Sequence, residues 1–400
     1  MTNRELFLLN VAQTSNFPLL LEIQKAEGIY LYDTTGKKYI DLISGISVSN
    51  VGHRHPKVVE AIKDQLDKYM HLMVYGEYVQ APQALLAQKL CSLLPTSLSS
   101  VYFVNSGSEA VEGAMKLAKR YTKRHKIISC IDSYHGSTQG ALSIGGNEKL
   151  KQNFRPLIPG TERIRFGNFE DLQRIDQETA AIFIETVQGE SGVKIANNEY
   201  FEALRFRCSE VEALLIFDEI QCGFGRTGKF WAFEYYNIVP DILLCAKSMG
   251  GGLPLGAFIS SPEIMSVLKE NPILGHITTF GGNPVCCAAS LATIEVLTER
   301  ELLNDVEAKA DLFLELLKHP LIVDKRNKGL MMALEFKNFS ILKKVIDCAI
   351  EKGVITDWFL FCDNAMRIAP PITITFDQIH ESCTLILDAL AEVNLQRLEL

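Results

Sequence analysis

From about Ser100 onward, continuous apolar runs alternate with segments whose apolar residues have helical spacing. A run that is apolar at every position predicts a strand covered on both faces, as in parallel sheets. Strands that alternate with amphipathic helices predict a doubly wound, mostly parallel sheet, so the expected fold class is α/β. The expected strands are Val101–Val104, Ile127–Ile131, Ala181–Ile184, Leu214–Phe217, Ile242–Ala246 and Ala257–Ser260.

The two ends of the chain are expected to form a second, smaller domain of the α+β type. A short strand signal, Gly28–Asp33, lies near the beginning. After about Thr298 the pattern shifts to helices with one short strand, Leu330–Phe336. A chain of 400 residues is long enough for two or three packed units. The expected division places 1–45 and 299–400 in the small domain and 46–298 in the large domain.

Charge and hydropathy argue against several classes of partner. The formal net charge is −8 at pH 7, which disfavours binding to nucleic acid or to an anionic membrane surface. Apolar residues make up 47% of the chain and charged residues 22%, as in ordinary globular proteins. No apolar stretch is long enough to span a bilayer. We therefore expect a protein that binds neither nucleic acid nor membranes.

Cysteine usage and the first residues favour a cytoplasmic location. The ten cysteines are scattered, mostly within apolar runs, and the adjacent pair Cys286–Cys287 is poorly placed for a disulfide. The start, Met1–Glu5, lacks the charged-then-apolar layout of a secretory signal. His53–Pro56 is the nearest segment to a metal motif. No further ligand residues lie near it in the sequence, so we expect no metal site.

Two of the expected strands are followed by residues of opposite charge. Asp218 follows Leu214–Phe217, and Lys247 follows Ile242–Ala246. In open parallel sheets, ligands bind outside the carboxyl ends of the strands. Lysine is rarely buried without a purpose, and burial lowers its pKa, which frees the amine for nucleophilic attack. Pyridoxal phosphate chemistry needs an amine that forms a Schiff base and an acid that keeps the ring nitrogen protonated. The pair therefore predicts a pyridoxal-phosphate enzyme, most simply an aminotransferase.

A third strand end predicts a phosphate site. Ser106 and Glu109 have the spacing of a capping box at the start of a helix. Gly107 and Ser108 lie between them, where backbone N–H groups and the positive end of the helix dipole can face an anion. A capped helix without a ligand is the alternative interpretation of this motif on its own.

Further polar residues follow the remaining strands. Tyr134 could stack on a flat ring, although a tyrosine at the edge of the core is an equally simple interpretation. Glu185 and Glu190 could act on substrate or pair with a cation, or they could lie in a solvated loop. Gln221 lies a short step past Asp218 and could reach a hydroxyl group of the ring.

Motifs that extend over nearly the whole chain carry a resemblance to a known family. They are Gly52–Pro56, Asn105–Ala110, Tyr134–Gly136, Phe217–Gly228, Pro240–Asp241, Ala246–Gly252, Thr279–Pro284 and Arg367–Pro371. With these motifs the chain resembles the class-III, fold-type-I aminotransferases, the group that contains acetylornithine, ornithine and 4-aminobutyrate aminotransferases. The resemblance implies the fold-type-I pyridoxal-phosphate transferase fold and transfer of an amino group to 2-oxoglutarate.

The resemblance also implies roles for single residues. Lys247 is expected to form the Schiff base and to move the proton on the substrate carbon, and Asp218 to pair with the pyridinium nitrogen. The other expected cofactor contacts are Ser106, Gly107 and Ser108 at the phosphate, Tyr134 stacked on the ring, Gln221 at the phenolic oxygen, and His135 and Glu185 nearby. Thr279 resembles a residue that reaches the phosphate across a dimer interface. A homodimer with shared active sites is therefore implied.

Substrate contacts are implied in the same way. Arg367 resembles the arginine that binds a carboxylate of 2-oxoglutarate or glutamate, a task that suits a bidentate guanidinium. Glu190 resembles its movable partner, which covers Arg367 while the amino donor occupies the site. Ser137 and Tyr75 are further expected substrate contacts.

Three positions depart from the family pattern. Ser137 stands where the acetylornithine and 4-aminobutyrate enzymes usually have an arginine that binds the donor's distal carboxylate. Phe17 stands near the position of a tyrosine in the ornithine enzymes, and Thr186 replaces a proline after Glu185. We therefore expect 2-oxoglutarate to be the acceptor and the donor to differ from acetylornithine.

Two alternatives stay open on the sequence alone. A decarboxylase, an aminomutase or a phospho-lyase could use the same fold and cofactor, because fold does not fix the reaction. The pairing expected between Glu190 and Arg367 favours the aminotransferase, since it serves a second, dicarboxylate substrate. A catalytically silent binding protein is the other alternative, and intact Lys247 and Asp218 argue against it.

Overall fold

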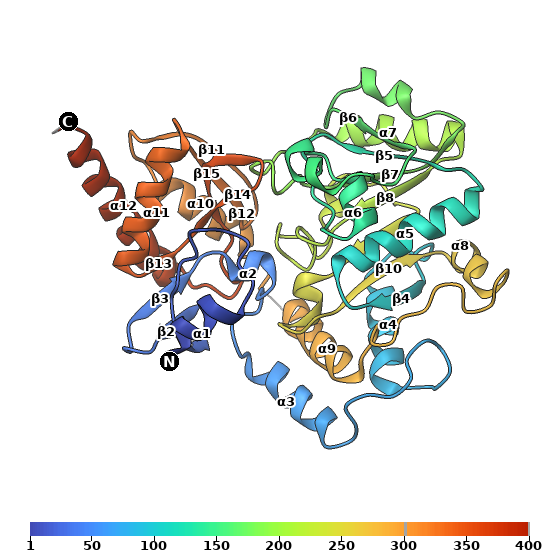
Figure 1. Ribbon diagram of the computed structural model, residues 1–400, viewed down its shortest axis with the longest axis horizontal. Helices are drawn as coiled ribbons and strands as arrows, with labels where there is room; N and C mark the ends of the chain where they lie inside the picture. The colour runs from blue at the N-terminus through green and yellow to red at the C-terminus, as the bar shows by residue number, and fades with distance from the viewer. Residues whose placement is uncertain (300–301, 399–400) are drawn as a thin grey trace.

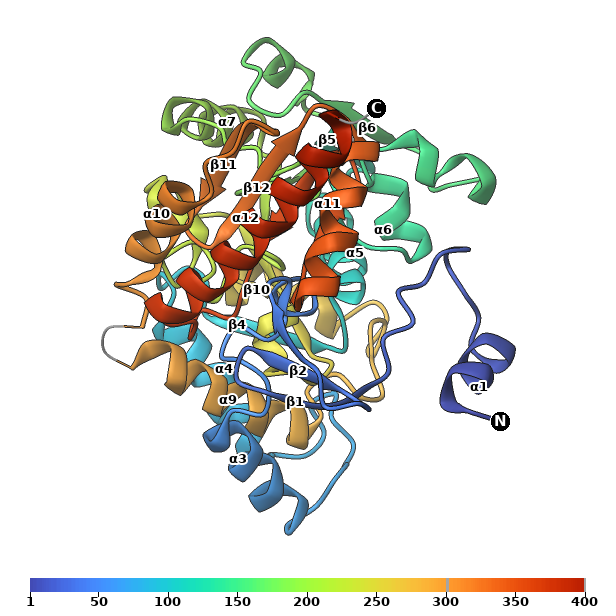
Figure 2. The same ribbon diagram turned by 90° about the vertical axis from the view of Figure 1, so that its left-hand side faces the viewer.

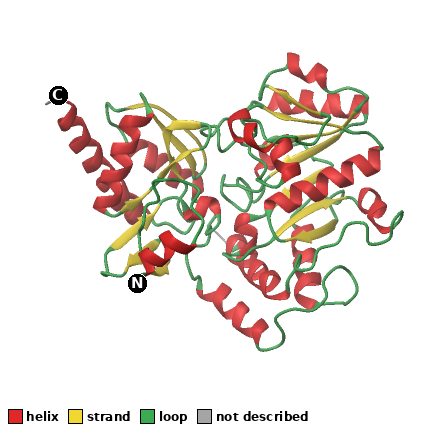
Figure 3. Ribbon diagram, viewed as in Figure 1, coloured by secondary structure: helices red, strands yellow, loops and turns green. Residues whose placement is uncertain are grey.

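A seven-stranded sheet forms the centre of the larger of two lobes (Figures 1 and 3). The computed structural model describes residues 1–299 and 302–398. The strand order is β4-β10-β9-β8-β7-β5-β6, and every neighbouring pair is parallel except the two pairs that β10 makes with β4 and β9. The strands are β4 (Ser100–Val104), β5 (Lys126–Cys130), β6 (Thr161–Ile164), β7 (Thr179–Glu185), β8 (Leu214–Asp218), β9 (Ile242–Cys245) and β10 (Gly256–Ser260).

Both faces of this sheet are buried, which explains the continuous apolar runs. In β7 the side chains alternate between two cores, because Ile182 and Ile184 pack in one cluster and Phe183 packs in the other. Helices α5 (Gly107–Thr122) and α6 (Gln139–Ile144) contribute to the cluster that contains Phe183. Helix α7 (Asn198–Val211) and several others cover the opposite face. The sheet is therefore doubly wound, as the sequence predicts.

The smaller lobe combines the two ends of the chain (Figure 1). One sheet has the order β1-β2-β3-β13, and its parallel β3–β13 pair joins Ile40 to Val354 across the sequence. The other has the order β11-β12-β15-β14. Their strands are β1 (Ile23–Glu27), β2 (Tyr30–Asp33), β3 (Lys38–Asp41), β11 (Ile322–Lys328), β12 (Met331–Phe336), β13 (Val354–Ile355), β14 (Asp357–Phe359) and β15 (Cys362–Ile368). The division into domains at residues 45 and 298 stays a prediction.

The other α-helices surround these sheets, and α1 lies apart from the body of the molecule in Figure 2. They are α1 (Asn3–Asn10), α2 (Ser44–Ser47), α3 (Pro56–Leu66), α4 (Ala81–Ser92), α8 (Pro262–Ser266), α9 (Pro284–Thr298), α10 (Val306–Leu316), α11 (Phe339–Lys352) and α12 (Phe376–Leu398). Within residues 1–299 and 302–398, no helix is long and apolar enough to cross a membrane.

A fully buried arginine links the two lobes. Arg226 donates from Nη1 to the carbonyl oxygens of Leu330 (3.0 Å) and Pro370 (2.6 Å), and from Nη2 to Asn50 Oδ1. Burial lowers the pKa of Arg226 to about 9. Its bonds connect the loop after β8 to the turn between β11 and β12 and to the segment after β15. These contacts fix the position of the C-terminal strands relative to the large sheet.

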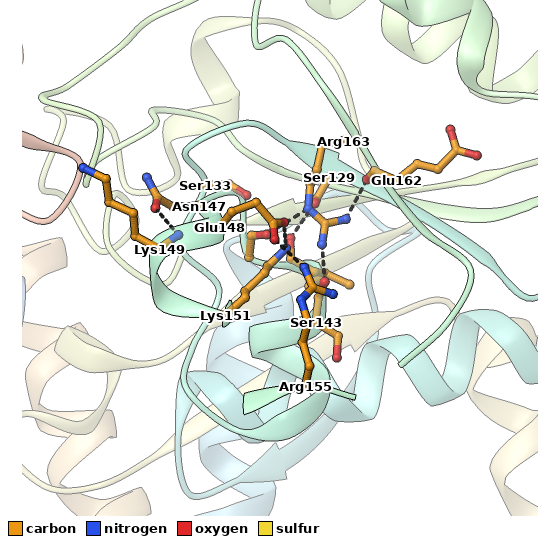
Figure 4. A network of polar contacts seen from close by, with 12 residues as sticks. Ser129, Ser133, Ser143, Asn147, Glu148, Lys149, Lys151, Arg155, Glu162 and Arg163 are labelled. Carbon is orange, nitrogen blue, oxygen red and sulfur yellow. Dashed lines mark hydrogen bonds and ion pairs between the residues drawn. The ribbon is translucent and has the colours of Figure 1, made fainter. Parts of the chain in front are cut away.

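A second polar network fixes the segment that follows α6 (Figure 4). Arg163 on β6 donates from Nε to the carbonyl oxygen of Gly145 (2.8 Å) and from Nη2 to that of Ser143. Glu148 forms ion pairs with Lys151 and Arg155. Because α6 directly follows the loop at 134–137, the network helps to hold that loop at the edge of the sheet.

The fold class is confirmed, and the differences lie in single elements. All six predicted strands of the large sheet are present, but β9 ends at Cys245, so Lys247 is not directly at a strand end. The sequence does not predict β1, β3, β6, β11, β13, β14 or β15. Strand β13 has only two residues, and the others carry charged or polar residues, as the residues Asp324–Lys328 of β11 do, and therefore lack a continuous apolar run.

Candidate active site

A cavity of about 360 Å³ lies at the carboxyl ends of β4, β5, β7 and β8. Its volume is within the range of small-molecule and cofactor sites. Nine of the residues expected at the cofactor line it: Ser106, Gly107, Ser108, Tyr134, His135, Glu185, Asp218, Gln221 and Lys247. These residues come from four strand ends and the turn after β9, so the parallel sheet brings together side chains that are far apart in the sequence.

Asp218 is the last residue of β8 and is buried. Its Oδ1 accepts a hydrogen bond from the backbone N–H of Ile220 (3.0 Å), and its Oδ2 lies 2.7 Å from His135 Nδ1. An ionised carboxylate can only accept, so His135 Nδ1–H donates to it. Among the described residues, His135 Nε2 has no hydrogen-bond partner. His135 therefore fixes the orientation of the Asp218 carboxylate and keeps one ring nitrogen available.

Glu185 lies next to Asp218, because the two residues are paired where β7 and β8 end. Burial, together with the negative charge of Asp218, raises the pKa of Glu185 to about 8. The backbone N–H groups of Tyr134 (3.1 Å) and Gly189 (3.0 Å) donate to its two oxygens and partly oppose that rise. Glu185 thus holds the loop that carries Tyr134.

Lys247 begins a short 3-10 helix, Lys247–Gly250, directly after β9. Its φ of 49° is in the left-handed region, which a residue with a side chain occupies at an energetic cost. Burial lowers the pKa of Lys247, partly opposed by the charge of Glu190. A lowered pKa raises the fraction of neutral amine, the form that attacks a carbonyl carbon.

The start of α5 forms an anion cradle. Ser106 caps the helix by accepting from the backbone N–H of Glu109 (3.2 Å). The reciprocal bond predicted for a capping box is wrong, because Glu109 Oε2 accepts from the N–H of Asn105 instead (2.6 Å). The N–H groups of Gly107 and Ser108 precede the first hydrogen bonds within the helix and have no partner among the described residues. They can donate to a phosphate.

Two glycines make this cradle narrow. A Cβ added at Gly107 would lie 2.9 Å from Ile220 Cδ1. A Cβ added at Gly136, whose φ is +126°, would lie 2.2 Å from Ser108 Oγ. The positive φ of Gly136 and its close approach to Ser108 favour glycine where the loop after β5 approaches α5.

Tyr134 and Ser137 belong to that loop. The Tyr134 hydroxyl lies 3.1 Å from Ser137 Oγ, and Ser137 itself is exposed. The backbone N–H of Ser137 donates to Ser108 Oγ (3.3 Å). Ser137 therefore lies at the rim of the cavity, beside the tyrosine expected to stack on the cofactor.

Glu190 and Arg367 form a buried bidentate ion pair. Nη1 of Arg367 lies 2.8 Å from Glu190 Oε1, and Nη2 lies 3.1 Å from Oε2. Burial alone would raise the pKa of Glu190, but the charge and hydrogen bonds of Arg367, together with the Lys247 charge and the N–H of Leu360, outweigh it, so the pKa is lowered. Gln221 connects the pair to the cavity, because its Nε2 lies 3.4 Å from Glu190 Oε1. The carboxylate-binding edge of Arg367 is thus covered by Glu190.

Two predicted site residues lie elsewhere in the single chain. Tyr75 lines a second cavity of about 430 Å³ together with Thr278, and neither residue lines the Lys247 cavity. Thr279 is exposed and lines neither cavity. The expected roles of both residues stay predictions, and that of Thr279 needs a second copy of the chain.

Several further residues shape the site and were not predicted from the sequence. Asp357 and the carbonyl oxygen of Trp358 contact Arg367, and Val48, Leu253 and Pro254 line the Lys247 cavity. No pattern in the sequence identifies them. Asp357 is recognisable as a partner only once the register of β14 and β15 is known.

Comparison with known proteins decides the family. The family described as "Aminotransferase class-III" matches residues 11–390. The chain belongs to the class-III aminotransferases. An acetylornithine aminotransferase from Methanocaldococcus jannaschii is 40% identical over 383 residues, which cover 92% of each chain.

Solved structures of similar aminotransferases superpose over nearly the whole chain. The ornithine aminotransferase from Toxoplasma gondii has a TM-score of 0.91 and 29% identity, covering 98% of this chain and 94% of its own. A transaminase from the marine bacterium Virgibacillus has a TM-score of 0.92 and 30% identity, covering 98% and 99%. The fold of this class-III aminotransferase is therefore the fold-type-I pyridoxal-phosphate transferase fold.

Pyridoxal 5′-phosphate is the cofactor of this class-III aminotransferase, and the cavity fits it. The cavity offers N–H groups of Gly107 and Ser108 for a phosphate, a buried carboxylate at Asp218 for a ring nitrogen, and an amine at Lys247 for an aldehyde. His135 Nε2, which has no partner among the described residues, adds a polar atom that a ligand could satisfy. These groups are the ones such a cofactor requires.

Proposed function

We propose that this enzyme moves an amino group from an amino donor to 2-oxoglutarate, with Lys247 and Asp218 as its catalytic residues. The observation that carries the proposal is the placement of a lysine of lowered pKa and a buried aspartate in one cavity, next to an arginine whose carboxylate-binding edge is covered by Glu190. When bound, pyridoxal phosphate supplies an electron-accepting ring and carries the amino group between two half-reactions.

The chain's own residues bind, orient and transfer protons. When the cofactor is bound, the backbone N–H groups of Gly107 and Ser108 would hold its phosphate, and Tyr134 would cover one face of its ring. Asp218, oriented by His135, would accept a hydrogen bond from the ring nitrogen. Lys247 would hold the cofactor through its amine and would move a proton at the substrate carbon.

Arg367 and Glu190 let one site accept two kinds of substrate. While a donor without a matching carboxylate is bound, Glu190 covers Arg367, so no buried charge is left unpaired. An incoming dicarboxylate replaces Glu190 at Nη1 and Nη2 and restores the bidentate geometry. This exchange supports transamination over a reaction that uses one substrate.

Ser137 limits which amino donors the site can bind. It lies at the rim of the cavity, where a longer cationic side chain would reach the donor's distal end. Serine offers a hydroxyl and no charge, so the site lacks a bidentate partner for a distal carboxylate there. We infer that the donor is an amino acid or ω-amine without a carboxylate at that distance.

We also propose a homodimer with shared active sites in the cytoplasm. Large apolar residues are exposed around the Tyr75 cavity and in the segment before α9, namely Tyr78, Val79, Ile273, Ile277 and Phe280. A second copy would cover them and bring Thr279 to a partner's phosphate site. All ten cysteines are free and eight of them are buried, which supports a reducing compartment.

Replacement of Lys247 tests the catalytic assignment. Lys247→Ala should lower turnover with any donor and 2-oxoglutarate by about a thousandfold or more, because no other amine of the described residues lines the cavity. Circular dichroism should be unchanged. Lys343→Ala, which removes a partly exposed lysine on α11, should keep full turnover. Turnover of Lys247→Ala near the wild-type rate would contradict the assignment.

A further inference from the structure

Arg367 contacts a second carboxylate, on a different edge from Glu190. Asp357 on β14 is paired in register with Arg367 on the neighbouring antiparallel strand β15. Residues opposite each other on antiparallel strands project to the same face of a sheet. Asp357 Oδ1 lies 2.9 Å from Arg367 Nε, whereas Glu190 contacts Nη1 and Nη2. The guanidinium is therefore held between two acids.

Among the described residues, the short strand β14 supplies the other hydrogen bonds of this guanidinium and its contact with an aromatic ring. Nη2 also donates to the carbonyl oxygen of Trp358 (3.2 Å), and the guanidinium carbon lies 4.6 Å from the centre of the Phe359 ring. Asp357, Trp358 and Phe359 are consecutive residues, so one element fixes the position and the plane of the guanidinium. The Nη1/Nη2 edge is left for Glu190 or for a substrate carboxylate.

Glu190 is bound in a way that permits its replacement. Besides Arg367, its side chain accepts from the N–H of Leu360 (3.1 Å) and from Gln221 Nε2 at the long distance of 3.4 Å. When Glu190 leaves, Arg367 keeps its bonds to Asp357 and Trp358. An arginine side chain has several rotatable bonds, and fixing it before binding removes part of the entropic cost of binding.

We propose that Asp357 is a positioning residue that keeps the Nη1/Nη2 edge of Arg367 aimed at the substrate carboxylate while Glu190 is displaced. The inference rests on the proposed exchange at Arg367 and extends it to a residue outside the cavity. Asp357 also leaves Arg367 with a counter-ion in the open state, so the buried cation is never unpaired.

The hydrogen bond and the charge of Asp357 have separable effects. Asparagine can still accept from Arg367 Nε through its amide oxygen. Loss of the negative charge strengthens the attraction of Arg367 for Glu190 and for an incoming carboxylate alike. Because these two anions compete for one edge, the two effects largely cancel. Asp357→Asn should therefore behave like the wild type, and Asp357→Ala should not.

The test is the half-reaction of the holoenzyme with L-glutamate alone, followed by the cofactor absorbance. Asp357→Ala should raise the half-saturating glutamate concentration about tenfold or more, the range expected for loss of a charge-assisted hydrogen bond. Its limiting rate should stay within about threefold of the wild type. Asp357→Asn should lie within about threefold of the wild type in both quantities. Asp324→Ala, which removes an acid on β11 that contacts Arg326 and not Arg367, is the matched control.

The outcomes separate this inference from the proposed function. Cofactor affinity should be the same in all four proteins. Two results would show that Asp357 has no positioning role. In the first, Asp357→Ala matches the wild type; in the second, Asp357→Ala and Asp357→Asn lose limiting rate and cofactor affinity equally. Either result overturns this inference and leaves the proposed function standing. A wild-type enzyme that does not react with glutamate would overturn the proposed acceptor together with the inference.

Discussion

At the level of single residues, the backbone conformation of Lys247 directs its amine into the cavity, and burial there lowers the pKa of that amine. The left-handed φ of Lys247 turns the chain sharply after β9, and the side chain enters the cavity that Asp218 also lines. Strained backbone of this kind persists only where the surrounding structure holds it in place. Buried Ser248 and Met249 follow directly in the sequence and provide such packing.

Replacement of Ser137 should change which amino donors the enzyme accepts. Ser137→Arg should raise kcat/KM for acetylornithine or 4-aminobutyrate about tenfold or more, because it supplies a charge-assisted partner for the donor's distal carboxylate. Residue 137 is exposed, so the longer side chain can be accommodated. Steady-state kinetics with 2-oxoglutarate as acceptor measure the effect.

Ser137→Met is the control for that substitution, since it adds length without charge. It should give no gain with either donor. A Ser137→Arg enzyme with unchanged kcat/KM for both donors would contradict the proposed account of the donor pocket.

At the scale of elements, the turn after β8 is held by a second buried acid, Glu219. Its oxygens accept from the backbone N–H groups of Ala232 (2.7 Å) and Phe233 (2.5 Å) and from Thr186 Oγ1 (3.2 Å). Burial raises the pKa of Glu219 to about 8 despite these bonds. Glu219 therefore keeps a proton in the folded chain at pH values where the unfolded chain has released it.

This difference predicts a pH dependence of stability. Between the ordinary pKa of 4.5 and about 8, unfolding releases a proton, so the free energy of unfolding falls as pH rises, by up to about 1.4 kcal/mol per pH unit from this group. Glu219→Gln removes that slope but loses an acceptor. The stability advantage of wild-type apoprotein over the variant should therefore be largest near pH 5 and shrink toward pH 8. Denaturant unfolding across that range measures it.

Glu234→Gln is the comparison, because Glu234 is an exposed carboxylate in the same region. This variant controls for replacing an acid by an amide in that region. An advantage of the wild type over Glu219→Gln that grows with pH would contradict the raised pKa of Glu219.

Burial determines which of these strands can be predicted from the sequence. Strands such as β7 and β8 are apolar at nearly every position because both faces are covered, and this pattern is visible in the sequence. Strands β6 and β11 have charged residues that face solvent or form ion pairs, so they resemble loops. Asp218 and Lys247 were predictable because a charge follows an apolar run. The contact of Asp357 with Arg367 depends on strand register, which the sequence does not display.

At the scale of the whole molecule, a shared active site predicts complementation between two impaired variants. Thr279→Ala should weaken cofactor binding about tenfold by removing one phosphate contact, and Lys247→Ala should be inactive. In a mixed dimer, the Thr279→Ala chain supplies an unaltered Lys247 and the Lys247→Ala chain supplies an unaltered Thr279 to the same site. One of the two sites is therefore intact. Co-expressed and purified hybrids should therefore approach half of the wild-type activity at limiting cofactor.

Homodimers of each variant are the controls and should stay at their own low activities under the same cofactor limitation. Hybrids that are no more active than the average of the two homodimers would contradict a site shared between chains. Light scattering should give the mass of a dimer for all of these proteins.

If this enzyme transfers an amino group in two half-reactions, the holoenzyme should react with one amino compound when no keto acid is present. L-glutamate should change the cofactor absorbance and yield one equivalent of 2-oxoglutarate per site, with the nitrogen retained on the enzyme. Single additions of acetylornithine, ornithine, lysine, 4-aminobutyrate and β-alanine should then identify the donor by the same change. Release of carbon dioxide or ammonia, or no change with any of these compounds, would contradict the account.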